Sequence, residues 1–262
     1  GTPATYAECY EWFVAPYPQD GDPFSDGDPL KAPHVINNSW SCPEREGCTD
    51  PDILRSVVDN VRAAGIVTVH SAANNGPNCG SLNKPSAIYD ASFSVGATDR
   101  DDQIAGFSSR GPSLQDGVLL TKPDISAPGV AIRSSIPGDS YGLKQGTSMA
   151  GPHVAGLVAL LIDVQPDLAG NVDQLEALIQ DTAVIQYSSE ECGEDEADSV
   201  PNNAYGWGRI DAYEAYEAAV DLPMPSPTPT STATVTPGAT STPTATAGAP
   251  REKVYAPLLF AP

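Results

Sequence analysis

The sequence predicts a domain of the α/β class, built around a parallel sheet. Residues 34–40 (HVINNSW) and 66–73 (IVTVHSAA) are short apolar runs typical of buried strands. Between them, residues 50–65 carry apolar side chains at helical spacing. A strand, a helix and a strand over this span form a right-handed βαβ unit with parallel strands, so we expect a layered α/β domain.

The remaining elements follow from hydrophobic periodicity and from capping residues. In the first helix, Asp50 can cap the start, Pro51 fits the first turn and Gly65 ends the helix. Further strands are predicted at residues 93–99 (FSVGATD) and 124–132 (DISAPGVAI). Further helices are predicted at residues 147–164, where Pro166 ends the pattern, and at residues 171–183 and 210–220.

The composition changes near residue 222 and divides the chain into three parts. Residues 1–222 contain the α/β pattern, whereas residues 223–250 are almost wholly Pro, Thr, Ser, Ala and Gly. Such a segment cannot bury enough apolar surface to offset its ordering entropy, so we expect a disordered linker. Residues 251–262 form a short apolar end, which is either a docking segment or address, or a frayed tail.

The chain is strongly acidic, and this limits the partners that it can bind. Lys and Arg number 13 against 34 Asp and Glu, for a formal net charge of -21. The balance argues against DNA or RNA, because that binding needs basic side chains to neutralise phosphates. It is typical of a soluble surface that repels copies of itself, so we expect a monomer, with a cationic substrate as the alternative. No apolar run approaches the roughly 20 residues that span a bilayer, so no transmembrane segment is expected.

The five cysteines are too few for a disulfide scaffold, and none lies in a C-x-x-C pair typical of zinc or redox sites. Cys42 and Cys48 could close a short loop in an oxidising compartment. The odd number leaves one cysteine unpaired or paired with a residue elsewhere.

Two acidic stretches raise the question of calcium, and no other cofactor is suggested. Residues 20–28 (DGDPFSDGD) lack the spacing of a known calcium loop and are rich in turn formers, which favours a solvated turn. Residues 189–199 (SEECGEDEADS) are most simply an exposed acidic loop. Structural calcium is the alternative interpretation of both.

Candidate chemical groups gather where the predicted parallel strands end. Ligands of such sheets bind beyond the carboxyl ends of the strands, and Asn74 and Asn75 follow the strand at 66–73 directly. Ser148 lies at the start of the helix at 147–164, where free N–H groups favour an anion. A hydroxyl, a backbone N–H and a side-chain amide are the groups that hold a tetrahedral oxyanion, which indicates acyl transfer. The alternative is that Ser148 only caps its helix.

Several motifs, in the same order along the chain, resemble those of the subtilisin-like serine proteases, the subtilase or peptidase S8 family. GTSMAGPHVAG (146–156) is similar to the family's nucleophile motif, AANN (72–75) to the segment that ends in its oxyanion asparagine, and VINNSW (35–40) to its substrate-binding strand. AAGIVTV, SVGATD, FSSRGP, KPDISAPGV and YGWGRIDAYEA also match. The resemblance covers about residues 33–220.

The resemblance implies a three-layer subtilisin-like fold and a secreted or cell-surface serine endopeptidase that acts on proteins or peptides. Ser148 would form the acyl-enzyme, and Asn75 together with the Ser148 N–H would form the oxyanion hole. Asn74 stands where the family usually has glycine. The substrate groove would be lined by Ser39, Trp40 and Ser41 on one wall and by Asn74 on the other.

The chain lacks the Asp and His motifs of the family's triad, D-T-G and H-G-T-H. None of its three histidines is expected to serve as the base. His153 lies on the helix of Ser148 but points away, and it resembles the family's structural histidine. His34 stands at the start of a strand, the end opposite the site, and His70 is most simply a packed core residue.

Two explanations of the missing base follow. We expect the chain to be the C-terminal portion of a longer, active protease, with a fold incomplete at its N-terminus and no activity of its own, because it lacks an initiator Met and has an odd number of cysteines. The alternative is a catalytically inactive homologue that acts as a binding or scaffold protein. An esterase on another α/β fold would need G-x-S-x-G, which GTSMA is not.

Overall fold

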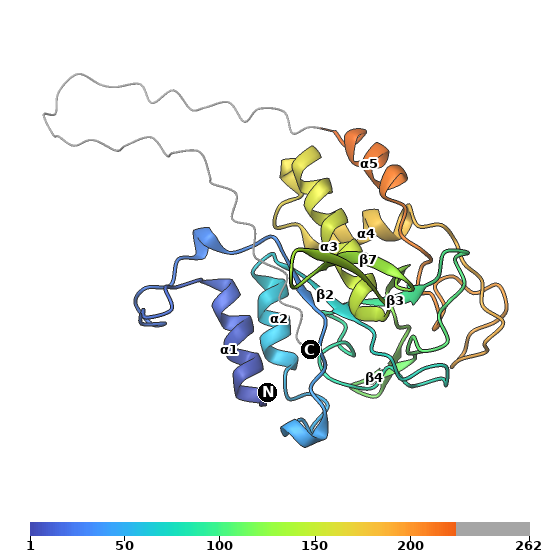
Figure 1. Ribbon diagram of the computed structural model, residues 1–262, viewed down its shortest axis with the longest axis horizontal. Helices are drawn as coiled ribbons and strands as arrows, with labels where there is room; N and C mark the ends of the chain where they lie inside the picture. The colour runs from blue at the N-terminus through green and yellow to red at the C-terminus, as the bar shows by residue number, and fades with distance from the viewer. Residues whose placement is uncertain (224–262) are drawn as a thin grey trace, which may run out of the picture. The chain divides into compact units, whose positions relative to one another are not determined.

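A parallel sheet of four strands lies at the centre of the fold, in the spatial order β1-β2-β3-β6 (Figure 1). The computed structural model describes residues 1–223, and Gly1–Asp221 form one compact unit. The strands are β1 (Val35–Asn38), β2 (Val67–Ser71), β3 (Phe93–Thr98) and β6 (Ile125–Pro128). The predicted α/β class is therefore confirmed. The predicted linker from residue 224 onward and the apolar end lie outside the described residues.

The register of the sheet brings the carboxyl ends of its strands to one edge. Asn38 at the end of β1 lies opposite His70, one residue before the end of β2. Val95 pairs with Ser71 on one side and with Ile125 on the other. The loops that follow β1 and β2 therefore leave the sheet at neighbouring places, where ligands of parallel sheets bind.

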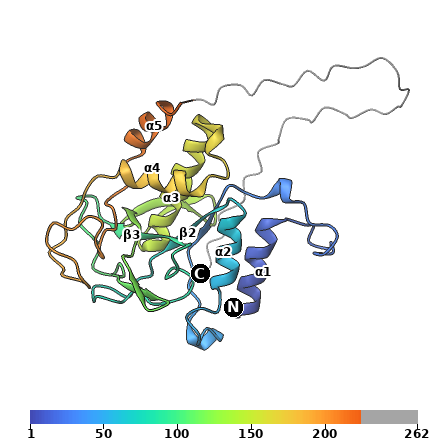
Figure 2. The same cartoon turned by 180° about the vertical axis from the view of Figure 1, so that it is seen from behind.

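Helices cover both faces of the sheet and complete three layers, which Figures 1 and 2 show from opposite sides. On one face, α2 (Arg55–Ala63) packs against β2 and against α1 (Pro3–Val14). On the other face, α3 (Thr147–Val164) contacts all four strands, and α5 (Ala212–Val220) packs on α3 and on α4 (Val172–Asp181). The long apolar helix predicted at residues 147–164 is thus the core helix of this layer.

The helix α1 was not predicted from the sequence. Thr2 caps it, because its hydroxyl accepts a hydrogen bond from the Thr5 N–H, and Pro3 takes the first helical position. Tyr10 is buried beneath it, 1% exposed, within an apolar cluster that includes Ile36 of β1. This burial of Tyr10, rather than a clear apolar stripe, anchors α1 to the domain.

The predicted start of the helix between β1 and β2 is wrong, although its end is confirmed. Residues 51–54 form turns, and α2 begins only at Arg55, without a side-chain cap. Asp50 instead accepts a hydrogen bond from the Asp52 N–H, which makes a local turn. Gly65 follows the helix with a φ of +81°, which favours glycine. A Cβ at this position would also collide with the backbone of Gly170, so both the backbone angle and the packing require glycine.

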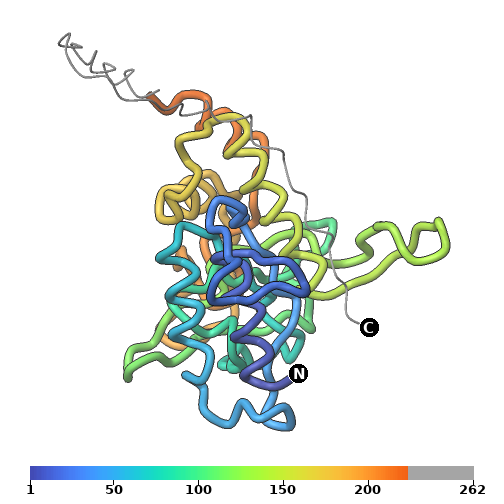
Figure 3. The backbone as a smooth tube through the Cα atoms, turned by 90° about the vertical axis from the view of Figure 1, so that its left-hand side faces the viewer, coloured from blue at the N-terminus to red at the C-terminus, as the bar shows by residue number. Residues whose placement is uncertain are grey.

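Two antiparallel hairpins extend from the layered core. The strands β4 (Ser113–Gln115) and β5 (Val118–Leu120) form one, and β7 (Ile132–Ile136) and β8 (Ser140–Lys144) form the other. Neither hairpin was predicted, and the stretch 124–132 contributes only β6 to the sheet. The hairpin β7–β8 projects from the domain (Figure 3) and leads directly into α3. Short 3-10 helices lie at Pro29–Lys31, Glu44–Glu46 and Pro166–Leu168.

Among the residues that the structure describes, α3 alone is long and apolar enough to cross a membrane by length and composition. Core helices of soluble proteins meet the same criterion. α3 contacts β1, β2, β3 and β6, and its buried face, which includes Val154 and Val158, packs in the interior of this domain.

Two adjacent leucines of α3 provide a test of this packing. Leu161 is 1% exposed and Leu160 is 60% exposed. We expect Leu161→Ala to lower the free energy of unfolding by about 2–5 kcal/mol, because it leaves a cavity in the interior. Leu160→Ala removes the same atoms from the surface and should cost less than about 0.5 kcal/mol. Urea unfolding measures both, and equal losses would contradict this orientation of α3.

Candidate functional site

Ser148 is the second residue of α3, and its hydroxyl does not cap the helix. The capping position is taken by Gly146, without a side-chain hydrogen bond, and the helix begins at Thr147. The Ser148 hydroxyl instead donates to the Ser39 carbonyl at 3.4 Å. The alternative of a simple helix cap is therefore wrong, and the half-buried hydroxyl faces the end of β1.

A second contact between Ser39 and Ser148 follows from a proline in the helix. Pro152 has no N–H, so the Ser148 carbonyl one turn earlier lacks its intrahelical donor. The Ser39 hydroxyl supplies one at 3.1 Å, and Asn37 donates in turn to that hydroxyl at 2.9 Å. The strand end and the first turn of α3 are thereby held in register.

The side chain of Asn74 joins the loop after β2 to the start of α3. Its Oδ1 accepts hydrogen bonds from the backbone N–H of Thr147 at 2.9 Å and from the Thr147 hydroxyl at 3.0 Å. Because Oδ1 faces these donors, the Nδ2 group on the opposite side of the amide points away from Thr147. No acceptor among the described residues engages that Nδ2, so its N–H groups remain available to a ligand.

Gly146 lies close to two hydrogen-bond donors. A Cβ at this position would lie 3.4 Å from Asn74 Nδ2 and 3.7 Å from the backbone nitrogen of Ser148. Its φ of +144° is also one that L side chains rarely adopt. A side-chain amide and a main-chain amide therefore lie near each other at Gly146, and two such donors can hold a tetrahedral oxyanion.

Asn75 is held in a different way from its neighbour. Its backbone N–H donates to the Ser109 hydroxyl at 3.1 Å, and its side chain is exposed without a hydrogen bond to the described residues. Ala73, just before the two asparagines, has a φ of +68°, which turns the chain at the end of β2. This turn determines which of the two asparagine side chains faces α3. The sequence AANN alone does not predict that turn.

The predicted groove residues do not all meet at Ser148. Ser39 and Asn74 contact the first turn of α3. The Trp40 ring stacks on Tyr6 of α1, with ring centroids 4.2 Å apart and 13° between planes. Ser41 is half-buried and makes no hydrogen bond to the described residues. The structure therefore places the Trp40 ring against α1.

No histidine of the described chain is hydrogen-bonded to Ser148. His153 is exposed on α3, where its Nδ1–H donates to the Met149 carbonyl at 2.9 Å. His34 is exposed at the amino end of β1. Both positions agree with the expectation that neither residue is a base for Ser148.

His70 lies on the face of β2 that is turned away from Ser148. Val69 faces α3, since it lies near Gly151, and alternate residues of a strand point to opposite faces. His70 is fully buried toward α1, where its Nδ1 meets the Ser86 hydroxyl at 2.8 Å and Tyr10 also bonds that hydroxyl. Burial, together with the positive charge of Lys122, lowers the pKa of His70 to about 3. It is a neutral core residue, as predicted.

Comparison with known proteins adds evidence that is independent of this geometry. Residues 6–208 match the model of the subtilase family. Bacillopeptidase F of Bacillus subtilis (strain 168) is 40% identical over 228 residues, which cover 84% of this chain and 14% of that protein. Subtilisin E of the same organism is 41% identical over 134 residues, 50% of this chain and 31% of the relative.

A further relative is the minor extracellular protease Vpr of Bacillus subtilis (strain 168), which is 42% identical over 123 residues, 45% of this chain and 14% of that protein. The chain therefore spans between 14% and 31% of the length of these three relatives.

Within residues 1–223, no group of three or more His, Cys, Asp or Glu side chains gathers in a way that could hold a metal ion. The acidic stretch at 20–28 forms local turns, in which Asp22 and Asp26 accept hydrogen bonds from nearby backbone N–H groups. The carboxylates of Asp22 and Asp26 are thus engaged with their own loop.

Buried His70 makes stability depend on pH in a predictable direction. Its pKa is about 3 in the folded protein, whereas an exposed histidine titrates near pH 6.5, so between these values only the unfolded chain binds the proton. Lowering the pH from 7 to 4 should therefore reduce the free energy of unfolding, by up to about 1.4 kcal/mol per pH unit from this group. Urea unfolding should show a smaller loss for His70→Gln, and identical losses in the two proteins would contradict the burial of His70.

Proposed function

The chain belongs to the subtilase family, and on that basis we propose that it is the serine-bearing portion of a subtilisin-like endopeptidase. In this proposal the Ser148 hydroxyl attacks the scissile carbonyl of a protein or peptide substrate and forms an acyl-enzyme. The observation that carries the proposal is that Asn74 Nδ2 and the backbone nitrogen of Ser148 both lie near the position where Gly146 lacks a Cβ.

The oxyanion of the tetrahedral intermediate is held by these two donors. As the carbonyl oxygen gains negative charge, Asn74 Nδ2 and the Ser148 N–H donate to it at the positive end of the α3 dipole. Thr147 fixes the Asn74 amide in advance through Oδ1, so little reorganisation is needed when the charge develops. The donors therefore stabilise the transition state more than the neutral substrate.

This geometry moves the proposed oxyanion residue from Asn75 to Asn74. Asn74 bonds the first residue of α3, whereas the hydrogen bond of Asn75 is made by its backbone and leads to Ser109. Ser39, Trp40 and Ser41 stay in the proposal as part of the substrate groove through the backbone at the end of β1. The ring of Trp40 contributes only by supporting that backbone from the side of α1.

The general base and its carboxylate are proposed to come from sequence other than residues 1–262. The three histidines lie at positions 34, 70 and 153, and none of them is hydrogen-bonded to Ser148. The lack of a base at Ser148 is also the observation that favours a second candidate, an inactive homologue that binds peptides without cleaving them. The two candidates differ in whether Ser148 reacts.

The compartment proposed for the protein is extracellular. Two disulfides, Cys42–Cys48 and Cys79–Cys192, suit an oxidising environment, and Cys9 is exposed and free. One relative is named as an extracellular protease. The net charge of -21 favours a monomer at low ionic strength.

Reaction at Ser148 is tested with the protein expressed from its complete reading frame, including any residues before Gly1. We expect a fluorophosphonate to label the wild-type protein and peptide substrates to be cleaved, with both lost in Ser148→Ala, because the proposal assigns the attacking hydroxyl to Ser148. Ser140→Ala, which removes an exposed hydroxyl from the hairpin β7–β8, is the matched control and should keep the labelling. An unlabelled, fully folded wild-type protein would support the inactive homologue instead.

The two asparagines are separated by parallel substitutions in the same protein. Asn74→Ala should lower kcat by about 10²-fold or more with a small change in KM, which is the loss that removal of the oxyanion asparagine causes in subtilisin. Asn75→Ala should leave kcat nearly unchanged, because its side chain forms no hydrogen bond with Thr147 or Ser148. The reverse pattern, a large loss for Asn75→Ala alone, would return the role to Asn75.

A further inference from the structure

We propose that Arg110 and Glu190 are positioning residues that hold the loop carrying Asn74 in its working geometry. The loop is called here the oxyanion loop (residues 73–76), and the inference rests on the function proposed above. Neither side chain touches Ser148 or Asn74 through a hydrogen bond of its own. They act through the segment 107–111, which is called here the support segment.

The support segment sets the position of the oxyanion loop through its backbone. The Ser109 N–H donates to the Ala73 carbonyl at 3.0 Å, and the Gly76 N–H donates to the Phe107 carbonyl at 2.9 Å. Between them, the Asn75 N–H donates to the Ser109 hydroxyl at 3.1 Å. These three hydrogen bonds lie on both sides of Asn74 in the chain, so the loop follows any shift of the support segment.

Close packing leaves the loop little freedom to adjust. A Cβ on Gly76 would lie only 2.0 Å from the Ser108 carbonyl oxygen, so the two backbones are in direct contact. The position of this carbonyl oxygen therefore fixes the end of the oxyanion loop. A group that holds the Ser108 carbonyl in place therefore also restrains Asn74, which lies two residues before Gly76.

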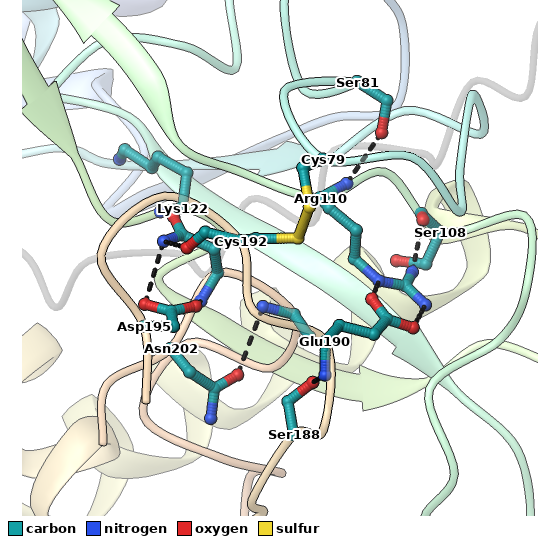
Figure 4. Close-up of a disulfide and its surroundings, with 12 residues drawn as sticks. Cys79, Ser81, Ser108, Arg110, Lys122, Ser188, Glu190, Cys192, Asp195 and Asn202 are labelled. Carbon is teal, nitrogen blue, oxygen red and sulfur yellow. Dashed lines mark hydrogen bonds and ion pairs between the residues drawn. A yellow bond between two sulfur atoms is a disulfide. The ribbon is translucent and has the colours of Figure 1, made fainter. Parts of the chain in front are cut away.

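Arg110 anchors that carbonyl through its buried side chain. The side chain is 1% exposed, and Nη1 donates to the carbonyl of Ser108 (Figure 4). It also donates to the carbonyl of Ala105. A buried guanidinium is stable only when it is paired, and Glu190 accepts from its Nε and from its Nη2, the latter at 2.8 Å. The guanidinium of Arg110 thus bonds the backbone carbonyls on one side and Glu190 on the other. These bonds hold the support segment in one conformation.

Glu190 lies in the acidic stretch 189–199, and the anchors of that stretch give it a structural role. Cys192, two residues further on, is bonded to Cys79, which follows the oxyanion loop (Figure 4). Asn203 donates to the Cys192 carbonyl at 2.9 Å and to Asp195. The carboxylate of Glu190 is thus presented to Arg110 from a loop that is tied covalently to the same part of the chain.

Such a clamp matters for catalysis because oxyanion donors act over short distances. A donor that is misplaced by about 1 Å can cost roughly 10²-fold in rate, and the loss falls on the transition state more than on substrate binding. Neutralising Glu190 leaves Arg110 buried without its counter-charge, so the support segment must shift to solvate it. The expected result is a loss in kcat with little change in KM.

The test compares Glu190→Gln with Glu191→Gln in the protein expressed from its complete reading frame. The side chain of Glu191 is exposed and makes no hydrogen bond or ion pair with the described residues. Glu191→Gln therefore removes the same negative charge at the adjacent position without changing the partner of Arg110. We expect Glu190→Gln to lower kcat and the rate of fluorophosphonate labelling by about 10-fold, with KM within about twofold. Glu191→Gln should match wild type in all three, and equal effects of the two substitutions would overturn the proposal.

A double substitution separates positioning from loss of stability. If the two residues act as one unit, Arg110→Gln combined with Glu190→Gln should lower kcat no further than Arg110→Gln alone. The urea midpoint of each variant shows whether the fold is intact under assay conditions. Multiplied losses in the double variant, with the fold intact, would mean that Glu190 acts independently of Arg110.

Hydrogen exchange provides a readout that does not depend on activity. In Glu190→Gln the backbone amides of Gly76 and Ser109 and the Thr147 amide bonded to Asn74 should exchange faster, while those of Glu191→Gln match wild type. Unchanged exchange at these amides would overturn the positioning role. Faster exchange in Glu190→Gln, together with a wild-type protein that cleaves no peptide, would leave the clamp in place and overturn the proposed function instead.

Discussion

The hydrogen bonds from Thr147 to the Asn74 side chain are the interaction on which the rest of the site depends. They join the loop after β2 to the first turn of α3, two segments 73 residues apart in the chain. An asparagine serves here because its amide has two different ends. One end accepts from the helix, and the other is left as a donor near Gly146.

The surrounding structure keeps this interaction in place from two directions. From the side of β1, Ser39 fills the hydrogen bond that Pro152 cannot make and so fixes the turn that carries Ser148. From the side of the support segment, the fully buried Arg110 and its partner Glu190 fix the oxyanion loop. The site is therefore assembled from loops and one helix start, while the parallel sheet supplies the frame.

Much of this arrangement could be predicted from the sequence where a local pattern determines it. The buried strands and α3 follow from apolar runs and small residues, and α3 has the predicted bounds. The start of α2 could not be predicted, because the side chain of Asp50 accepts a hydrogen bond within a local turn and does not cap the helix. The choice between Asn74 and Asn75 depends on the left-handed turn at Ala73, and the Arg110–Glu190 pair joins residues 80 apart. Contacts of that kind arise only when the chain is folded.

The most direct test of the central claim is a crystal structure of the protein with Ser148 phosphonylated by a fluorophosphonate. The phosphonyl oxygen stands in for the oxyanion of the tetrahedral intermediate. The account predicts that this oxygen lies about 2.7–3.1 Å from both Asn74 Nδ2 and the Ser148 backbone nitrogen, beside Gly146. An oxygen bonded to the Asn75 side chain, or directed to solvent away from both donors, would contradict it.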